Sequence, residues 1–163
     1  MKSLLIVCHT LTGGSLQMAR AAEAGCRREP EVAVRLQMAA SAGPEQLLQA
    51  DGYLFACPEN LGSMSGLMKD FFDRSYYPVL DRLQGRPYAS MVCAGSDGSN
   101  AARQIERIVT GWRLKAIAEP LIVCTHAQTA EQILRSKAIA AIDLARCEEI
   151  GATIASGLAL GIY

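Results

Sequence analysis

The sequence has no excess of charge of either sign, because 16 lysines and arginines balance 16 aspartates and glutamates. That balance gives no support to a nucleic-acid or membrane-surface partner, since both attract clustered positive charge. No apolar run approaches the roughly 20 residues needed to cross a bilayer. The apolar stretch at residues 4–8 is too short for a secretion signal, and no small-residue cleavage site follows it. We therefore expect a cytoplasmic protein without membrane or nucleic-acid partners.

The six cysteines form no C-x-x-C pair, so the usual spacing of a metal site is missing. A chain of 163 residues, half of them apolar, has enough core to fold without disulfides. Cys8, Cys57, Cys93 and Cys124 end predicted strands, and we interpret them as small buried apolar side chains rather than as a row beneath a ligand. The sequence has no linker, repeat or low-complexity segment. We expect a single domain over residues 1–163.

Short apolar runs alternate with longer amphipathic ones, which predicts βαβ units around a parallel sheet. The expected strands cover residues 3–8, 32–38, 53–57, 88–93 and 121–124. The expected helices cover residues 15–25, 44–48, 65–83 with a kink or an end at Pro78, 100–114, and a last helix from about Ala138.

The strand at residues 32–38 differs from the others because polar Arg35 and Gln37 alternate with its apolar residues. Strands buried on both faces are continuously apolar, whereas half-exposed strands alternate. We therefore place residues 32–38 at an edge of the sheet, with the first and third strands inside. A five-stranded parallel sheet in the order 2-1-3-4-5 meets this requirement.

In such a sheet, ligands bind at the carboxyl ends of the strands, near the point where the strand order reverses. The segment that follows the first strand offers glycine amides, a helix N-terminus and hydroxyl groups, which together suit a phosphate dianion. Its candidate residues are Thr10, Thr12, Gly13, Gly14 and Ser15. The segment has neither G-x-x-x-x-G-K-[ST] nor G-x-G-x-x-G, which weakens nucleoside-triphosphate and dinucleotide interpretations. A plain glycine-rich turn that caps a helix is the alternative.

Two further loops, residues 58–66 and 94–100, also follow strands and are rich in small polar residues. Such loops present main-chain donors and acceptors, which suit the edge of a flat heteroaromatic ring. Each loop alone is also compatible with a solvated turn. Because three such loops are expected at one edge of the sheet, we favour a shared ligand site.

Two motifs resemble known flavoproteins. Thr10-Leu11-Thr12-Gly13-Gly14-Ser15 resembles the flavodoxin phosphate loop. Pro58-Glu59-Asn60-x-Gly62-x-x-Ser65-Gly66-x-x-Lys69-Asp70-Phe71-x-Asp73-Arg74 is similar to the second loop and following helix of NAD(P)H-dependent FMN reductases and related quinone reductases. The resemblance spans nearly the whole chain. It implies an α/β fold, a flavodoxin-like three-layer α/β/α sandwich, with FMN as cofactor and NAD(P)H as co-substrate.

The resemblance also implies a role for each loop. The FMN phosphate would be held by Thr10, Thr12, Gly13, Gly14 and Ser15. The isoalloxazine ring would lie along Pro58, Glu59, Asn60, Leu61, Gly62, Ser63 and Met64. Its pyrimidine side or the ribityl chain would contact Ala94, Gly95, Ser96 and Gly98. Relatives assemble as dimers or tetramers, so a homo-oligomer is implied as well.

The function implied is the transfer of electrons from NAD(P)H through FMN to a small acceptor such as a quinone or free flavin. Such chemistry needs no side-chain acid, base, nucleophile or metal, so we assign no catalytic residue. An electron carrier of the flavodoxin type is the alternative. Carriers usually stack the ring between aromatic side chains and are strongly acidic, whereas the second and third loops have no aromatic residue and the chain is neutral. A relative that no longer binds flavin and acts as a scaffold is a third possibility.

Overall fold

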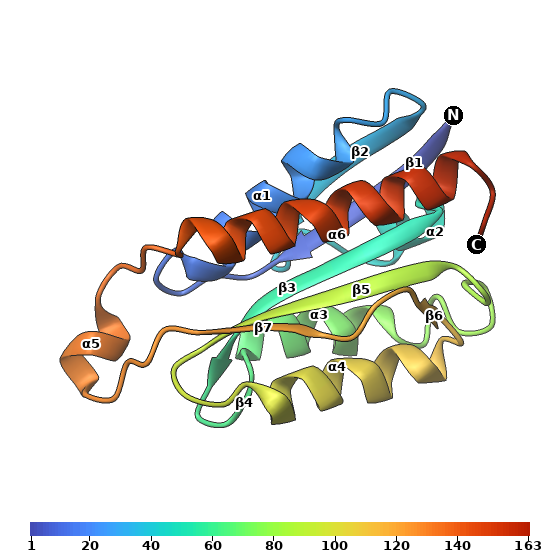
Figure 1. The fold of residues 1–163 in the computed structure, drawn as a ribbon. Coiled ribbons are helices and arrows are strands. Elements are labelled where there is room, and N and C mark those ends of the chain that lie inside the picture. Colours follow the sequence, from blue (N-terminus) through green and yellow to red (C-terminus); the bar gives the residue numbers. More distant parts are fainter.

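The computed structural model describes residues 1–163 and contains one mixed β-sheet with helices on both faces (Figure 1). The strands are β1 (Lys2–Cys8), β2 (Val32–Met38), β3 (Gly52–Asn60), β4 (Ser63–Met64), β5 (Pro87–Ala94), β6 (Lys115–Ala116) and β7 (Leu121–Cys124). The helices are α1 (Gly14–Cys26), α2 (Pro44–Gln49), α3 (Gly66–Ser75), α4 (Ser99–Gly111), α5 (Ala130–Leu134) and α6 (Ala141–Ala159).

The parallel part of the sheet runs β2-β1-β3-β5, and the last position beside β5 is shared by β6 and β7. Lys115 pairs with Pro87 near the start of β5, and Leu121 pairs with Met91 further along the same strand. The predicted order 2-1-3-4-5 is therefore confirmed, with its fifth strand in two pieces. Pro120 lies between β6 and β7. It has no N–H group, and at this position no hydrogen bond of the sheet needs one. The antiparallel strand β4 was not predicted.

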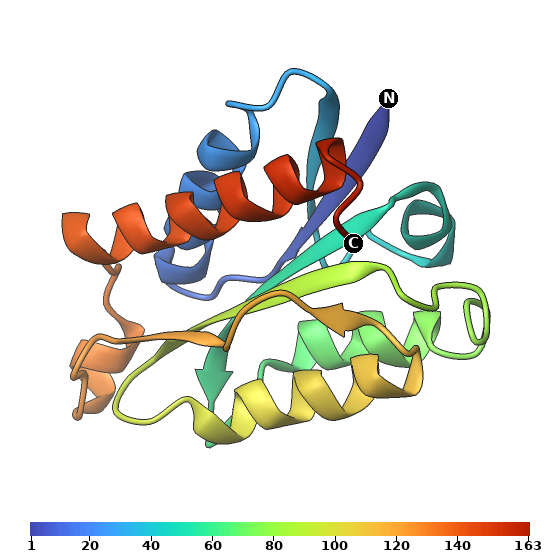
Figure 2. The ribbon, with the colours of Figure 1, turned by 45° about the vertical axis from the view of Figure 1, so that its right-hand side comes forward.

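Helices cover both faces of the sheet, and the short helix α2 packs through Leu47 on the same face as α3 and α4. Helices α1 and α6 pack on one face, and α3 and α4 on the other (Figures 1 and 2). Strand β3 contributes side chains to the cores on both faces of the sheet, because successive side chains of a strand point to opposite faces. Tyr53 and Phe55 enter the aromatic core under α3 and α4, while Leu54 and Ala56 enter the aliphatic core under α1 and α6. No helix is long and apolar enough to span a membrane.

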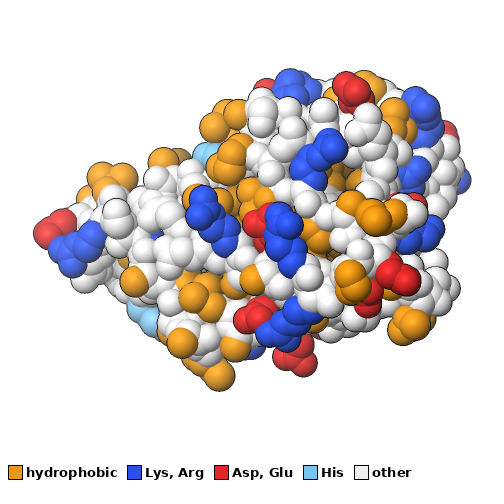
Figure 3. All heavy atoms as spheres, turned by 90° about the horizontal axis from the view of Figure 1, so that it is seen from above, with side chains coloured by type: hydrophobic (Ala, Val, Ile, Leu, Met, Phe, Trp, Pro, Cys, Tyr) orange, Lys and Arg blue, Asp and Glu red, His pale blue; other side chains and the backbone are white.

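Helices α1 and α6 approach each other closely because each has a glycine at the contact. A Cβ atom on Gly151 would overlap the carbonyl oxygen of Ala22, and one on Gly25 would overlap that of Glu148. The outer surface of this layer carries lysine and arginine interspersed with aspartate and glutamate (Figure 3). The close packing fixes α1 on the sheet, and with α1 the loop at its N-terminus.

Three predicted helix boundaries were wrong, and one helix was missed. Helix α4 ends at Gly111 rather than at residue 114. Helix α3 ends at Ser75, well before residue 83, and turns follow it through Pro78, whose ring disfavours helix in the preceding residue. The last helix begins at Ala141 rather than near Ala138. The short helix α5 was missed because it has five residues, none of them buried, and hence no apolar periodicity. Its capping box of Thr129 and Gln132 was the one local signal in the sequence.

Candidate functional site

The carboxyl ends of β1, β3, β5 and β7 meet at one edge of the sheet, and the loops that follow them enclose a cleft of about 530 Å³. Its 15 lining residues come from four loops, of which the sequence singled out three. They are Leu11, Thr12, Pro58, Glu59, Asn60, Leu61, Cys93, Ala94, Gly95, Ser96, Thr125, Ala127, Gln128, Ile133 and Lys137.

The loop between β1 and α1 leaves several amides at the helix N-terminus without partners. Gly13 has a φ of +92°, a conformation that favours glycine, and its N–H donates to Thr10 Oγ1 at 2.9 Å. The first bond of the helix runs from Gln17 N to Gly13 O at 3.1 Å. The N–H groups of residues 14–16 therefore have no acceptor within the helix, and they lie at its positive end.

Ser15 adds a hydroxyl group to the same place. Its side chain is 2% exposed, and its Oγ atom has no hydrogen-bond partner. A buried hydroxyl without a partner is costly, and a bound anion would satisfy it. The free amides, the helix dipole and this hydroxyl group together fit a phosphate group, which is what the resemblance implied for residues 10–15.

The second loop divides into a part that lines the cleft and a part that supports it. Pro58, Glu59, Asn60 and Leu61 line the cleft. Gly62, Ser63 and Met64 do not, because they complete the hairpin between β3 and β4. Contact of these three residues with FMN stays a prediction.

Gln104 of α4 fixes that hairpin. Its Oε1 atom accepts hydrogen bonds from Ser63 Oγ at 2.9 Å and from Met64 N at 2.8 Å. Asn100, at the start of α4, donates to Gly62 O at 2.7 Å. Sequence reasoning missed both supporting residues because they lie about 40 positions from their partners along the chain.

The third loop is tied to the second by a carboxylate. Glu59 Oε2 accepts the N–H of Gly98 at 2.7 Å, so Glu59 holds the two loops together. Ala94, Gly95 and Ser96 line the cleft, whereas Gly98 does not and is the N-cap residue of α4. Glu59 was predicted as a ring contact, which stays a prediction, and the structure gives it this positioning role.

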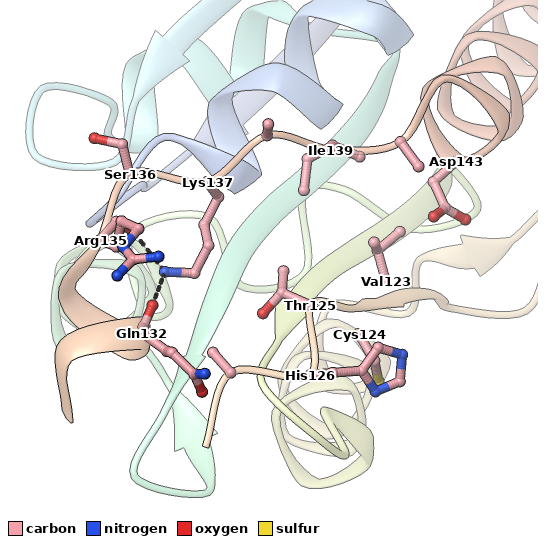
Figure 4. Close-up of a pocket in the computed structure, with 13 residues that line it drawn as sticks. Val123, Cys124, Thr125, His126, Gln132, Arg135, Ser136, Lys137, Ile139 and Asp143 are labelled. Atoms are coloured by element: carbon pink, nitrogen blue, oxygen red, sulfur yellow. Dashed lines mark hydrogen bonds between the residues drawn. The ribbon is translucent and has the colours of Figure 1, made fainter. Parts of the chain in front are cut away.

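The fourth loop, residues 125–140, was not predicted as part of the site. It doubles back from β7 through α5 and reaches the phosphate loop, where Lys137 N donates to Thr12 O at 2.9 Å. Thr125, Ala127, Gln128, Ile133 and Lys137 enter the cleft from this side. A second hollow of about 420 Å³ lies against the same loop (Figure 4).

Two further side chains sit where strands end at the site. Cys93 lines the cleft, and burial raises the pKa of its thiol while the nearby Lys137 ammonium opposes that shift. The thiol is therefore protonated at neutral pH and is no nucleophile. His9 Nδ1 lies 2.7 Å from Ser65 Oγ, and burial lowers the pKa of His9. A neutral imidazole thus joins the end of β1 to the start of α3.

A comparison with protein families shows which family the chain belongs to. Residues 3–129 match the family described as NADPH-dependent FMN reductase, and this match covers well over half of the chain. The chain belongs to the NADPH-dependent FMN reductase family.

Curated relatives of this FMN reductase family member include two redox proteins. A flavodoxin of Aquifex aeolicus is 35% identical over 96 residues, which cover 59% of this chain and 50% of that one. An NAD(P)H dehydrogenase (quinone) of Acidithiobacillus ferrooxidans is 33% identical over 95 residues, which cover 46% of this chain and 48% of that one. The chain spans about half the length of the curated relatives it matches.

Solved structures match the fold of this FMN reductase family member from end to end. A WrbA-like flavodoxin of Agrobacterium tumefaciens superposes with a TM-score of 0.76 at 17% identity, over 98% of this chain and 99% of that chain. An archaeal flavodoxin gives a TM-score of 0.75 at 18% identity, over 98% of this chain and 99% of that chain. The flavodoxin-like fold predicted from the sequence is thereby confirmed.

Proposed function

We propose that this protein is an FMN-binding oxidoreductase that passes electrons from NAD(P)H through the flavin to a small acceptor such as a quinone or free flavin. One observation carries the proposal. The unpartnered Ser15 hydroxyl and the free amides at the start of α1 directly follow Leu11 and Thr12, which line a cleft together with residues 58–61 and 94–96. The amides and the hydroxyl suit a phosphate group, and the cleft suits a flat ring; these are the two ends of FMN. The description of the family names the same cofactor.

The residues of the site act by binding and orientation. Amides of residues 14–16 and the Ser15 hydroxyl would hold the phosphate through hydrogen bonds and the helix dipole. The loop of residues 94–96 would lie along the edge of the ring, and Glu59 keeps that loop in place through Gly98. When bound, FMN supplies the hydride and electron chemistry. The two charged side chains of the cleft, Glu59 and Lys137, both hold main-chain groups of the surrounding loops in place.

The make-up of the cleft favours a reductase over an electron carrier. None of its 15 lining residues is aromatic, so no ring of the protein covers the faces of a bound isoalloxazine. A face left open allows a nicotinamide ring to stack on the flavin, as direct hydride transfer requires. The flavodoxin-type carrier is the second candidate, supported by the flavodoxin name of one relative.

Titration with FMN and with riboflavin, followed by flavin fluorescence, tests the binding part of the proposal. Riboflavin has no phosphate, so we expect it to bind more weakly than FMN. Ser15→Ala should weaken FMN about tenfold, because a hydrogen bond to a charged group is lost, and should leave riboflavin binding unchanged. Equal binding of FMN and riboflavin by the wild type would contradict the phosphate site.

Oxidation of NADH or NADPH by the loaded protein, with a quinone as acceptor, tests the enzyme part. We expect steady turnover in the absence of any partner protein. Protein that holds FMN and leaves both nicotinamides unoxidised would instead support the carrier. Protein that binds no FMN at all would support the scaffold.

A further inference from the structure

We infer that Ile133, carried on the α5 segment (residues 127–137), is the apolar contact that holds the isoalloxazine ring in place of the missing aromatic residues. This inference rests on the proposed function, because it concerns the same cleft. It assigns a ligand-contacting role to a part of the chain that the family match, which ends at residue 129, does not reach.

The α5 segment contributes little to the core of the protein. Helix α5 has no buried residue, and it projects beyond the end of the sheet (Figures 1 and 2). Apart from the backbone bonds of Lys137, every hydrogen bond of residues 127–137 stays within the segment. Four of its residues nevertheless line the flavin cleft: Ala127, Gln128, Ile133 and Lys137. The segment therefore serves the cleft rather than the stability of the fold.

The cleft gathers exposed apolar side chains from three separate loops. Ile133 is 47% exposed, Leu11 is 58% exposed, and Leu61 is fully exposed, yet all three line this one cleft. Large aliphatic side chains grouped around a hollow indicate an apolar ligand surface, since burying them would be favourable. The two faces of a flavin ring are apolar surfaces of this kind. Aliphatic contacts thus supply the burial that aromatic stacking provides in electron carriers.

A set of hydrogen bonds fixes the α5 segment to the helix that holds the phosphate. Gln17 of α1 donates from Nε2 to Gly13 O at 3.0 Å and to Lys137 O at 2.7 Å, and its Oε1 accepts Ile139 N at 3.0 Å. The segment and the phosphate loop therefore share one anchor.

Lys137 completes this arrangement at the end of α5. Its Nζ atom donates to the carbonyl oxygens of Gln132 at 2.9 Å and Arg135 at 2.6 Å (Figure 4), and to that of Ile133 at 2.8 Å. All three ammonium protons are used to close the C-terminus of α5. The turn that carries Ile133 is thus fixed from both sides.

The test compares Ile133→Ser with Leu134→Ser, a matched control in the same helix. Leu134 is 68% exposed and does not line the cleft. We expect Ile133→Ser to weaken FMN and riboflavin alike, by about fivefold, because the lost contact is with the ring that both share. Leu134→Ser should leave both affinities unchanged. Ile133→Phe should tighten both, because it adds an aromatic face.

The outcomes separate this inference from the proposed function. Wild-type protein that binds FMN while Ile133→Ser binds both flavins as the wild type does would overturn the inference alone. Weakening of FMN without weakening of riboflavin would also overturn it, because the effect would then lie at the phosphate. Wild-type protein that binds neither flavin would overturn the proposed function and this inference together. Circular dichroism of each variant checks that the fold is intact.

Discussion

The Sγ atom of Cys93 lies against Gly14, so closely that a Cβ atom on residue 14 would be 2.5 Å from the sulfur. This contact joins the end of β5 to the first residue of α1, and so brings the third loop to the phosphate loop. Glycine at position 14 is therefore required by this neighbour. The thiol occupies the space that a side chain would need.

Gly14→Ala should destabilise the protein by about 1–3 kcal/mol, the usual cost of overpacking a tight site, and should weaken FMN binding. Cys93→Ala in the same chain should restore most of both losses, because it removes the sulfur that the new methyl group meets. Urea unfolding and FMN titration of the two single variants and the double variant measure the coupling. Additive effects of the two substitutions would contradict the contact as the cause.

Glu59→Ala should loosen the third loop, because the N–H of Gly98 would lose its acceptor. We expect FMN affinity to fall about tenfold, in line with the loss of a charge-assisted hydrogen bond. Glu59→Gln keeps an oxygen in the same position and should retain most of the affinity. If the two variants bind FMN equally, the bond from Gly98 to Glu59 has no positioning role.

Gln104→Ala should cost about 1–3 kcal/mol of stability, because the Met64 amide and the Ser63 hydroxyl would lose their shared acceptor. Chemical unfolding measures this loss. Gln104→Glu preserves the acceptor oxygen and provides the matched control. A wild-type stability for Gln104→Ala would mean that water replaces the side chain and that the hairpin holds its shape alone.

The stability of the protein should fall as the pH rises above about 9. Burial raises the pKa of Cys8, Cys26, Cys57 and Cys147 to about 12, whereas thiols of the unfolded chain have a pKa near 9.0. Between these values the unfolded state releases protons that the folded state retains, which favours unfolding. Each thiol contributes a slope of at most about 1.4 kcal/mol per pH unit. The contribution is fully present below pH 9.

Urea unfolding between pH 8 and about 11 measures this dependence, with Cys57→Ala as the comparison. Cys57 is completely buried, so its removal should make the decline shallower. A decline of equal slope in both proteins would assign the effect to other groups, such as the buried tyrosines.

Local patterns were sufficient for most of the sheet. Alternation at Arg35 and Gln37 placed β2 at an edge, and the glycines and hydroxyl residues after β1 indicated the phosphate loop. The same kind of pattern misplaced the end of α3, because apolar residues continue past Ser75 in turns that pack on the core. Periodicity reports which face is buried, and turns with buried side chains can share that signature with a helix.

The sequence by itself indicated a parallel sheet, an edge position for residues 32–38 and three polar, glycine-containing loops after strands, because each of these depends on residues near one another along the chain; the order 2-1-3-4-5 met these requirements, and the structure established it. Only the tertiary structure decided which of those residues face the cleft and what supports them. Gln17 meets Lys137 across 120 positions, and Glu59 meets Gly98 across 39. No local pattern encodes such pairs, since they exist only after the helices pack on the sheet. Ile133 enters the site for the same reason, on a short helix without a buried face.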